Sequence, residues 1–195
     1  MNLSRIILLL ALFCAGGTAA RAADIASADS ELAFLAGYGI THPGFGATRT
    51  EVQTVDAIAR YGRFLSPEAG HGAWWQGRHE LLLELPLHLA VNRDNRVMTG
   101  GYLLGSWKFT GLAGERLLPY LFAGGGVLFV DLGLPTMGTR LDFSYQGGIG
   151  VQYLLQKGLA LMGEYRYHHV SNAGTAEPNE PLNGSKFLFG LTKFY

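Results

Sequence analysis

Residues 79–89 of this chain read HELLLELPLHL, with leucine at every odd position from 81 to 89. Because successive side chains of a β-strand point to opposite faces, these leucines share one face, and Glu80, Glu84 and His88 share the other. A strand with one apolar and one charged face is typical of a membrane barrel, in which the apolar face contacts lipid and the charged face lines the lumen. This stretch therefore predicts a transmembrane β-strand.

The same rhythm recurs along the chain between clusters of turn-forming residues. The segments that we expect to form strands are Glu31–Thr41, Thr50–Phe64, Gly77–Val91, Val97–Phe109, Leu117–Val130, Asp142–Leu155, Gly158–Val170 and Ser185–Tyr195. Tilted strands of about ten residues cross a bilayer, and closure of the sheet removes unpaired backbone edges from the lipid. We therefore expect an all-β fold, an eight-stranded antiparallel transmembrane β-barrel. A soluble barrel such as a lipocalin is the alternative, and the low charge of these segments disfavours it.

The first residues of the chain are typical of a secretory signal peptide. Arg5 precedes the apolar run of residues 6–13, which is too short to anchor the chain in a membrane. Ala20-Arg21-Ala22 fits a cleavage site, with Thr18-Ala19-Ala20 as the alternative. The expected domains are a cleaved signal peptide over residues 1–22 and an outer-membrane barrel over residues 23–195. The single cysteine, Cys14, lies in the signal segment, so we expect no disulfide in the mature chain.

Charge and hydropathy exclude several classes of function. The chain has 15 basic and 15 acidic side chains, and removal of Arg5 and Arg21 leaves the mature part slightly acidic. No basic stripe predicts binding to nucleic acid. No apolar run after the signal segment reaches the roughly 18 residues of a membrane helix. The 28 glycines and many aromatics, without a spanning helix, instead favour a barrel in the bacterial outer membrane, and the signal peptide predicts export through the inner membrane.

A candidate site lies in residues 167–174, which read YHHVSNAG at the end of an expected strand. His169 and Ser171 are two residues apart and therefore share a face, which can place a base beside a hydroxyl nucleophile. The apolar side of this strand carries His169 and Ser171 together with Leu159, Leu161, Tyr165 and Tyr167, and the opposite side carries Glu164, Arg166 and His168. With both termini in the periplasm, this strand ends at the extracellular rim. The alternative is a polar girdle followed by an ordinary turn.

The segment from His169 to Gly174, followed by Pro178-Asn179 and a closing strand, resembles the PagL family, the lipid A 3-O-deacylases. Members of that family are eight-stranded outer-membrane barrels that hydrolyse the ester-linked acyl chain at the 3-position of lipid A. The motif covers only the segment from His169 onward, and the rest of the chain agrees in size, signal peptide and strand rhythm. The final Phe194-Tyr195 also resembles the C-terminal signal of proteins inserted into the outer membrane.

The resemblance implies a role for each motif residue. Ser171 is the implied nucleophile and His169 the implied general base, with Asn172 and Gly174 at the oxyanion. The family has a glutamate as the third triad member, and ungapped counting places Asn183 there, with Glu180 or Glu177 as alternatives. No metal or organic cofactor is implied. The expected partners are lipid A, as part of lipopolysaccharide, and the outer-membrane lipid, with no nucleic acid and with a homodimer left open.

Two other functions stay open from the sequence. One is a non-catalytic outer-membrane barrel with a structural or binding role, and the other is acyl transfer to an acceptor other than water. We further expect a buried ion-pair network in the lumen, formed by Arg60, Glu80, Glu84, Glu164 and Arg166. Aromatic belts at the membrane interface are expected to include Trp74, Trp75 and Tyr120.

Overall fold

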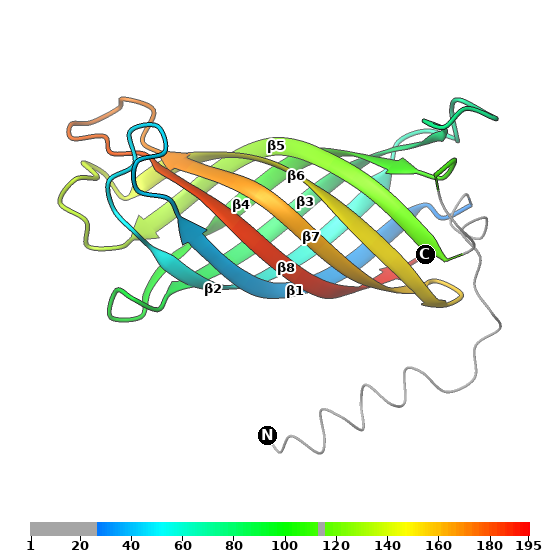
Figure 1. Ribbon diagram of the computed structural model, residues 1–195, viewed down its shortest axis with the longest axis horizontal. Coiled ribbons are helices and arrows are strands. Elements are labelled where there is room, and N and C mark those ends of the chain that lie inside the picture. The colour runs from blue at the N-terminus through cyan, green and yellow to red at the C-terminus, as the bar shows by residue number, and fades with distance from the viewer. Residues whose placement is uncertain (1–26, 113–115) are drawn as a thin grey trace, which may run out of the picture.

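The computed structural model describes residues 27–112 and 116–195, so the expected signal peptide and Cys14 lie outside the described residues. The strands are β1 (Ser30–Thr41), β2 (Gln53–Phe64), β3 (Gly77–Ala90), β4 (Arg96–Phe109), β5 (Leu117–Asp131), β6 (Leu141–Gln156), β7 (Leu159–Ser171) and β8 (Leu182–Phe194). Each pairs antiparallel with the next, and β1 pairs with β8, which closes the barrel (Figure 1). The expected eight-stranded fold is confirmed. Over residues 27–112 and 116–195, no helix has the length and apolar character needed to cross a membrane.

The two ends of the barrel differ in their connections. One end, which we call the site end, carries the loops of residues 42–52, 91–95, 132–140 and 172–181, on the left in Figure 1. The other end, the terminal end, carries the start of β1 and the end of β8. The described connections there are residues 65–76 and 157–158, together with residues 110–112 and 116 between β4 and β5.

The wall of the barrel shows the two faces that residues 79–89 predict. Leu81, Leu83, Leu85 and Leu87 of β3 are exposed on the outside. Glu80, Glu84 and His88 of the same strand are buried in the lumen. An outer surface made of exposed leucines is stable in lipid and not in water, which agrees with a membrane-spanning wall.

Ion pairs fill the middle of the lumen. Arg60 Nη2 lies 2.6 Å from Glu84 Oε1 and 2.5 Å from Glu164 Oε1. Arg166 Nη1 lies 2.9 Å from Glu84 Oε2, and Arg166 also contacts Glu164. Glu80 pairs separately with Lys108 at 3.3 Å. Buried charges are tolerated when they are paired in this way, so the expected network is confirmed.

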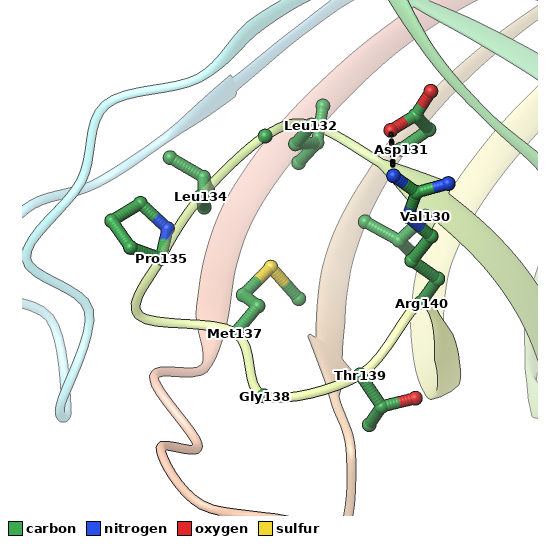
Figure 2. A pocket seen from close by; sticks show the side chains of 10 residues that line it. Val130, Asp131, Leu132, Leu134, Pro135, Met137, Gly138, Thr139 and Arg140 are labelled. Carbon is green, nitrogen blue, oxygen red and sulfur yellow. Dashed lines mark ion pairs between the residues drawn. The ribbon is translucent and has the colours of Figure 1, made fainter.

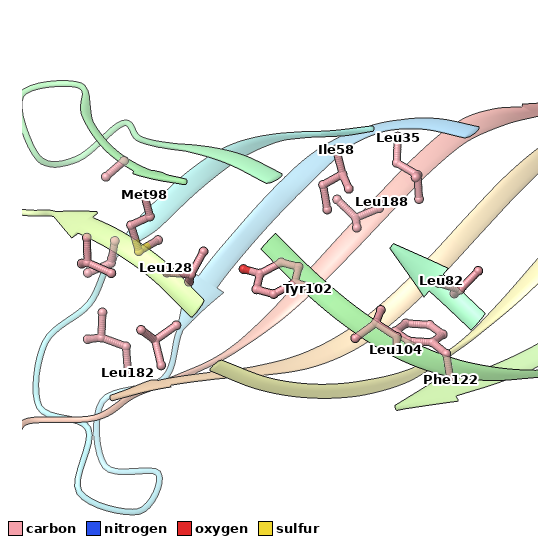
Figure 3. Packing of buried hydrophobic residues seen from close by; sticks show 14 of the residues in the cluster. Leu35, Ile58, Leu82, Met98, Tyr102, Leu104, Phe122, Leu128, Leu182 and Leu188 are labelled. Carbon is pink, nitrogen blue, oxygen red and sulfur yellow. The ribbon is translucent and has the colours of Figure 1, made fainter. Parts of the chain in front are cut away.

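Apolar side chains occupy the remaining interior (Figure 3). The labelled members of this cluster are Leu35, Ile58, Leu82, Met98, Tyr102, Leu104, Phe122, Leu128, Leu182 and Leu188. Together with the ion pairs they pack the lumen of a small barrel, whose interior is just wide enough for side chains.

Two residues lie on a different face from the one expected. Tyr120 is not part of an aromatic belt, because it points into the lumen with 2% exposure and its Oη donates to Glu164 Oε1 at 2.6 Å. Leu159 is buried rather than lipid-facing, since the register between β6 and β7 shifts between Leu154 and Gln156 at the adjoining turn. Trp74 and Trp75 are exposed, as an interfacial belt requires.

Two strand boundaries affect the candidate site. β8 begins at Leu182 rather than at Ser185, so Asn183 is a strand residue and not a loop residue. β2 begins at Gln53 rather than at Thr50, which leaves residues 50–52 in the loop after β1. The ladder between β7 and β8 continues as far as Leu182, which lengthens β8, whereas the ladder between β1 and β2 ends at Gln53.

Candidate functional site

The barrel register brings the motif residues together at the site end. His169 of β7 lies opposite Asn183 of β8 and opposite Tyr145 of β6. Ser171 lies opposite Phe143 of β6. His169 and Ser171 are both half-buried and point to the outer side of the wall, whereas the intervening Val170 is buried inside. The period-2 alternation of one strand thus places the two polar side chains next to each other on one face.

Three side chains form a continuous hydrogen-bonded row. The distance from Ser171 Oγ to His169 Nε2 is 3.0 Å, and the distance from His169 Nδ1 to Asn183 Oδ1 is 2.7 Å. A hydroxyl, an imidazole and a group that orients the imidazole are the components of a serine hydrolase triad. Of the three sequence candidates for the third member, Asn183 is the residue that contacts His169.

Glu180 and Glu177 do not contact His169. Glu180 Oε1 accepts the backbone N–H of Arg49 at 2.9 Å and that of Thr50 at 2.7 Å, so this carboxylate holds the loop of residues 42–52. Burial opposes its charge, but hydrogen bonds from Thr136, Thr50 and the Arg49 backbone lower the pKa of the Glu180 carboxyl below its ordinary value. Glu177 is exposed, and no hydrogen bond joins it to His169 in the described part of the chain.

The expected oxyanion donors are engaged within their own loop. Asn172 is 1% exposed, and its Nδ2 donates to the carbonyls of Ala176 at 2.8 Å and Pro178 at 3.3 Å. Its Oδ1 accepts the backbone N–H of Gly174 at 2.9 Å. These contacts shape the loop of residues 172–181 and leave neither donor free for a substrate.

Asn179, which the sequence analysis did not single out as a site residue, contacts the residue that follows Ser171. Its Oδ1 accepts the backbone N–H of Asn172 at 3.0 Å. That bond fixes which side of the amide faces Asn172, and it leaves the Asn179 Nδ2 group with no hydrogen-bond partner among residues 27–112 and 116–195. The Pro178-Asn179 element of the motif was the available signal.

Aromatic rings surround the row on the outer wall. The Tyr145 ring stacks on the His169 imidazole, with ring centroids 4.2 Å apart and an angle of 18° between the planes. Tyr167 Oη donates to Asn183 Oδ1. The ring of Tyr167 also lies edge-on to Phe45 of the loop after β1, with 6.0 Å between centroids. These contacts hold the imidazole in one plane.

The loop of residues 132–140 braces the motif loop from the β6 side. Gly138 N–H donates to the Pro178 carbonyl at 2.6 Å, and Glu180 N–H donates to the Thr136 carbonyl at 3.0 Å. Residues of this loop and the end of β5 line an open cavity of about 370 Å³, and Figure 2 shows the side chains that line it. Neither Ser171 nor His169 lines that cavity, so it is separate from the row. Within the described residues, no group of three or more histidine, cysteine, aspartate or glutamate side chains could hold a metal ion.

A family model described as "Lipid A 3-O-deacylase (PagL)" matches residues 62–192. The chain belongs to the PagL family. The match extends from β2 to β8 and contains the whole Ser171–His169–Asn183 row. The chain is therefore an outer-membrane barrel of a family of lipid A deacylases, and lipid A is the substrate class of that family. No curated protein matches the chain in sequence.

Solved structures agree with this PagL-family member in fold. The crystal structure of the outer membrane enzyme PagL superposes with a TM-score of 0.56 at 15% identity, covering 82% of this chain and 97% of that chain. Neisserial surface protein A (NspA) gives a TM-score of 0.62 at 13% identity, covering 85% and 97%. The N-terminal β-barrel domain of Pseudomonas aeruginosa OprF gives 0.53 at 14% identity, covering 86% and 98%. At such low identity the likeness concerns the barrel alone.

Proposed function

We propose that this chain hydrolyses the ester-linked 3-hydroxyacyl chain at the 3-position of lipid A, with Ser171 as nucleophile and His169 as general base. The observation that carries the proposal is the Ser171–His169–Asn183 row, with contacts of 3.0 Å and 2.7 Å across two neighbouring strands. A serine hydroxyl is a weak nucleophile until an adjacent base accepts its proton. The row supplies that base and a third group that orients it.

The proton moves along the row in a defined direction. The Asn183 amide oxygen accepts a hydrogen bond from His169 Nδ1–H, and the proton stays on Nδ1. Nε2 therefore carries no proton and can take the proton of Ser171 Oγ. Ser171 Oγ attacks the ester carbonyl carbon as its proton passes to Nε2. Collapse of the tetrahedral intermediate breaks the ester bond, and His169 returns the proton to the departing 3-hydroxyl of the sugar. Water, deprotonated by His169, then attacks the acyl-enzyme and releases the 3-hydroxy fatty acid.

The oxyanion of this intermediate needs a hydrogen-bond donor. Asn172 and Gly174 were the expected donors, but their N–H groups serve the loop. We assign the role to the unpaired Nδ2 of Asn179, whose amide is held by the residue that follows Ser171. A donor fixed in advance by the protein is worth more than one that must reorganise during the reaction.

The position of the row suits a substrate that stays in the membrane. Ser171 and His169 share the outer wall with the exposed side chains of Phe143, Tyr145 and Tyr165, and the lumen behind them is packed. We place the site end at the extracellular rim, where the ester bonds of lipid A meet the outer wall. An acyl chain can then lie along the apolar wall while its ester reaches Ser171.

Among the described residues, no carboxylate is hydrogen-bonded to His169, so none stabilises the imidazolium that forms during the reaction. Besides the Asn183 amide oxygen, the face of the Tyr145 ring compensates for this charge, stacked on His169 with 4.2 Å between centroids. A cation over an aromatic face gains about 0.5–2 kcal/mol, depending on how far it is desolvated. The row thus has a nucleophile, a base and a group that orients the base. It stabilises the positive charge on His169 less than a glutamate would.

Mass spectrometry of lipid A tests the proposal. Cells that express the wild type should lose one ester-linked 3-hydroxyacyl group, whereas cells that express Ser171→Ala or His169→Ala should not. Ser185→Ala is a matched control, because Ser185 Oγ also contacts a histidine, His42 Nε2 at 2.9 Å, on the same wall but outside the row. This variant should retain activity.

Unchanged lipid A with a folded wild-type barrel would contradict the proposal and favour the non-catalytic barrel. A second lipid that has gained the released acyl group would instead identify acyl transfer.

A further inference from the structure

Thr48 is a buried residue of the loop after β1, with 2% exposure. Its Oγ1 donates to the Pro181 carbonyl at 2.9 Å. The same oxygen accepts the Asn183 backbone N–H at 2.9 Å and the Asn183 Nδ2 group at 2.8 Å. Asn183 Nδ2 also donates to the Phe45 carbonyl at 3.3 Å. The loop of residues 42–52 thus surrounds the side of Asn183 that faces away from His169.

These contacts have only one consistent set of directions. The Pro181 carbonyl oxygen can only accept a hydrogen bond, so the single hydroxyl proton of Thr48 is donated to it. Thr48 Oγ1 can therefore only accept hydrogen bonds from Asn183. The Phe45 carbonyl oxygen can also only accept, so the group of Asn183 that contacts it must be a donor. The amide nitrogen of Asn183 must therefore face the loop, and its oxygen must face His169 Nδ1. That arrangement requires the His169 proton on Nδ1 and leaves Nε2 free for Ser171.

We propose that Thr48 is a positioning residue that sets the amide orientation of Asn183 and, through it, the tautomer of His169, a role that rests on the proposed function. A carboxylate presents an acceptor oxygen to the imidazole in either orientation, whereas an amide presents an acceptor oxygen in one orientation and a donor nitrogen in the other. A flipped Asn183 amide would turn Nδ2 toward His169 Nδ1 and favour a proton on Nε2, where it blocks acceptance of the Ser171 proton. An asparagine at this position needs neighbours that select its orientation, and Thr48 makes the shorter of the two contacts to Nδ2 that do so, at 2.8 Å against 3.3 Å for the Phe45 carbonyl.

Glu180 holds the segment of the loop that directly follows Thr48. Its carboxylate accepts the backbone N–H groups of Arg49 and Thr50, which directly follow Thr48. Thr41 Oγ1 donates to the Thr50 carbonyl at 2.7 Å and ties the same segment to the end of β1. The carboxylate that the motif loop provides therefore acts on the row indirectly, through the loop that carries Thr48.

A double-mutant cycle between Thr48 and Asn183 tests this role, with kcat and KM measured on purified lipopolysaccharide in micelles. Thr48→Val removes the hydroxyl without changing the shape and should lower kcat by about tenfold or more at unchanged KM. Thr48→Ser restores the hydroxyl and should stay within about threefold of the wild type. In an Asn183→Asp background, Thr48→Val should change kcat by less than about threefold relative to Asn183→Asp alone, because either oxygen of a carboxylate can accept the hydrogen bond from His169 Nδ1.

Each outcome of the cycle decides the role. An equal loss in the two backgrounds would show that Thr48 only supports the loop. No loss in the first background, or a folded Asn183→Asp barrel without activity, would also overturn the role. A Ser171→Ala variant measured in parallel separates the two proposals: if it is as active as the wild type, the catalytic assignment itself fails. Retained heat-modifiable migration on gels shows that each variant has a folded barrel.

Discussion

Asn183 lies directly opposite His169 in the β7–β8 ladder, and its amide oxygen is 2.7 Å from His169 Nδ1. The two residues are cross-strand neighbours on the outer face, so the backbone hydrogen bonds of the barrel fix the spacing between them. This ladder position carries a neutral amide, whereas the resemblance of the motif to the PagL family implies a glutamate. The site therefore keeps the orientation that a triad needs and lacks the negative charge.

Asn183→Ala should lower kcat by about 100-fold with little change in KM, since the imidazole loses the acceptor that selects its tautomer. Release of 3-hydroxy fatty acid from purified lipopolysaccharide measures both constants. Ser185→Ala, two residues further along β8, is the control and should remain close to the wild type. A KM effect without a kcat effect would place Asn183 in substrate binding instead.

Asn179→Asp isolates the donor that we assign to the oxyanion. The substitution keeps an oxygen for the Asn172 N–H and replaces the free Nδ2 by a second oxygen. It should lower kcat by about 100-fold or more, because a negative oxygen then faces the developing charge. Rates equal to those of the wild type would move the oxyanion donor to another group of the motif loop.

Acid should release the loop of residues 42–52 through Glu180. The pKa of this carboxyl is lower in the folded chain than in the unfolded chain, so its contribution to stability is complete above the unfolded value and disappears as pH falls through the folded value. The wild type should therefore resist proteolysis in this loop better than Glu180→Gln at neutral pH. The two should become equally sensitive at a pH below the ordinary range of glutamate. A difference that persists in acid would point to a role of Glu180 other than its charge.

The lumen network should dominate stability and leave the chemistry unchanged. Glu84 pairs with Arg60 and Arg166, so Glu84→Leu leaves two buried guanidinium groups short of an anion. Loss of one partner in a buried network costs about 3–5 kcal/mol, whereas Glu51→Gln at an exposed position should cost less than about 0.5 kcal/mol. Urea unfolding in detergent gives both values. Similar midpoints for the two variants would contradict a structural role of the network.

Local alternation was sufficient to predict the wall of the barrel. The leucines of residues 79–89 and the pair formed by His169 and Ser171 were placed on the correct faces, because strand geometry alone assigns them. Tyr120 was misplaced because an aromatic beside the apolar Leu121 is equally plausible on either face. Its partner in the lumen, Glu164, belongs to another strand.

The surroundings of the row depend on contacts that no local pattern reveals. Leu182-Asn183-Gly184 has the composition of a turn, yet pairing with β7 makes it strand. Glu180 bonds to Thr50, 130 positions earlier in the chain, and Thr48 reaches Asn183 across a similar separation. The roles of Thr48 and Glu180 could be inferred only once the loops had been brought together by closure of the barrel.

The three tryptophans of the chain allow the opposite end of the barrel to be observed alone. Trp74 and Trp75 lie in the connection of residues 65–76, and Trp107 of β4 donates its Nε1 proton to the Trp75 carbonyl at 3.1 Å. Trp74 also stacks near Phe109, with 6.4 Å between ring centroids. Indole rings favour the membrane–water interface, where the ring contacts lipid and the N–H finds a polar partner. In bilayers, lipids brominated close to the head group should therefore quench the intrinsic fluorescence more strongly than lipids brominated near the chain ends. Stronger quenching by the chain-end label would instead place these rings inside the hydrocarbon layer and shift the terminal end of the barrel into the membrane.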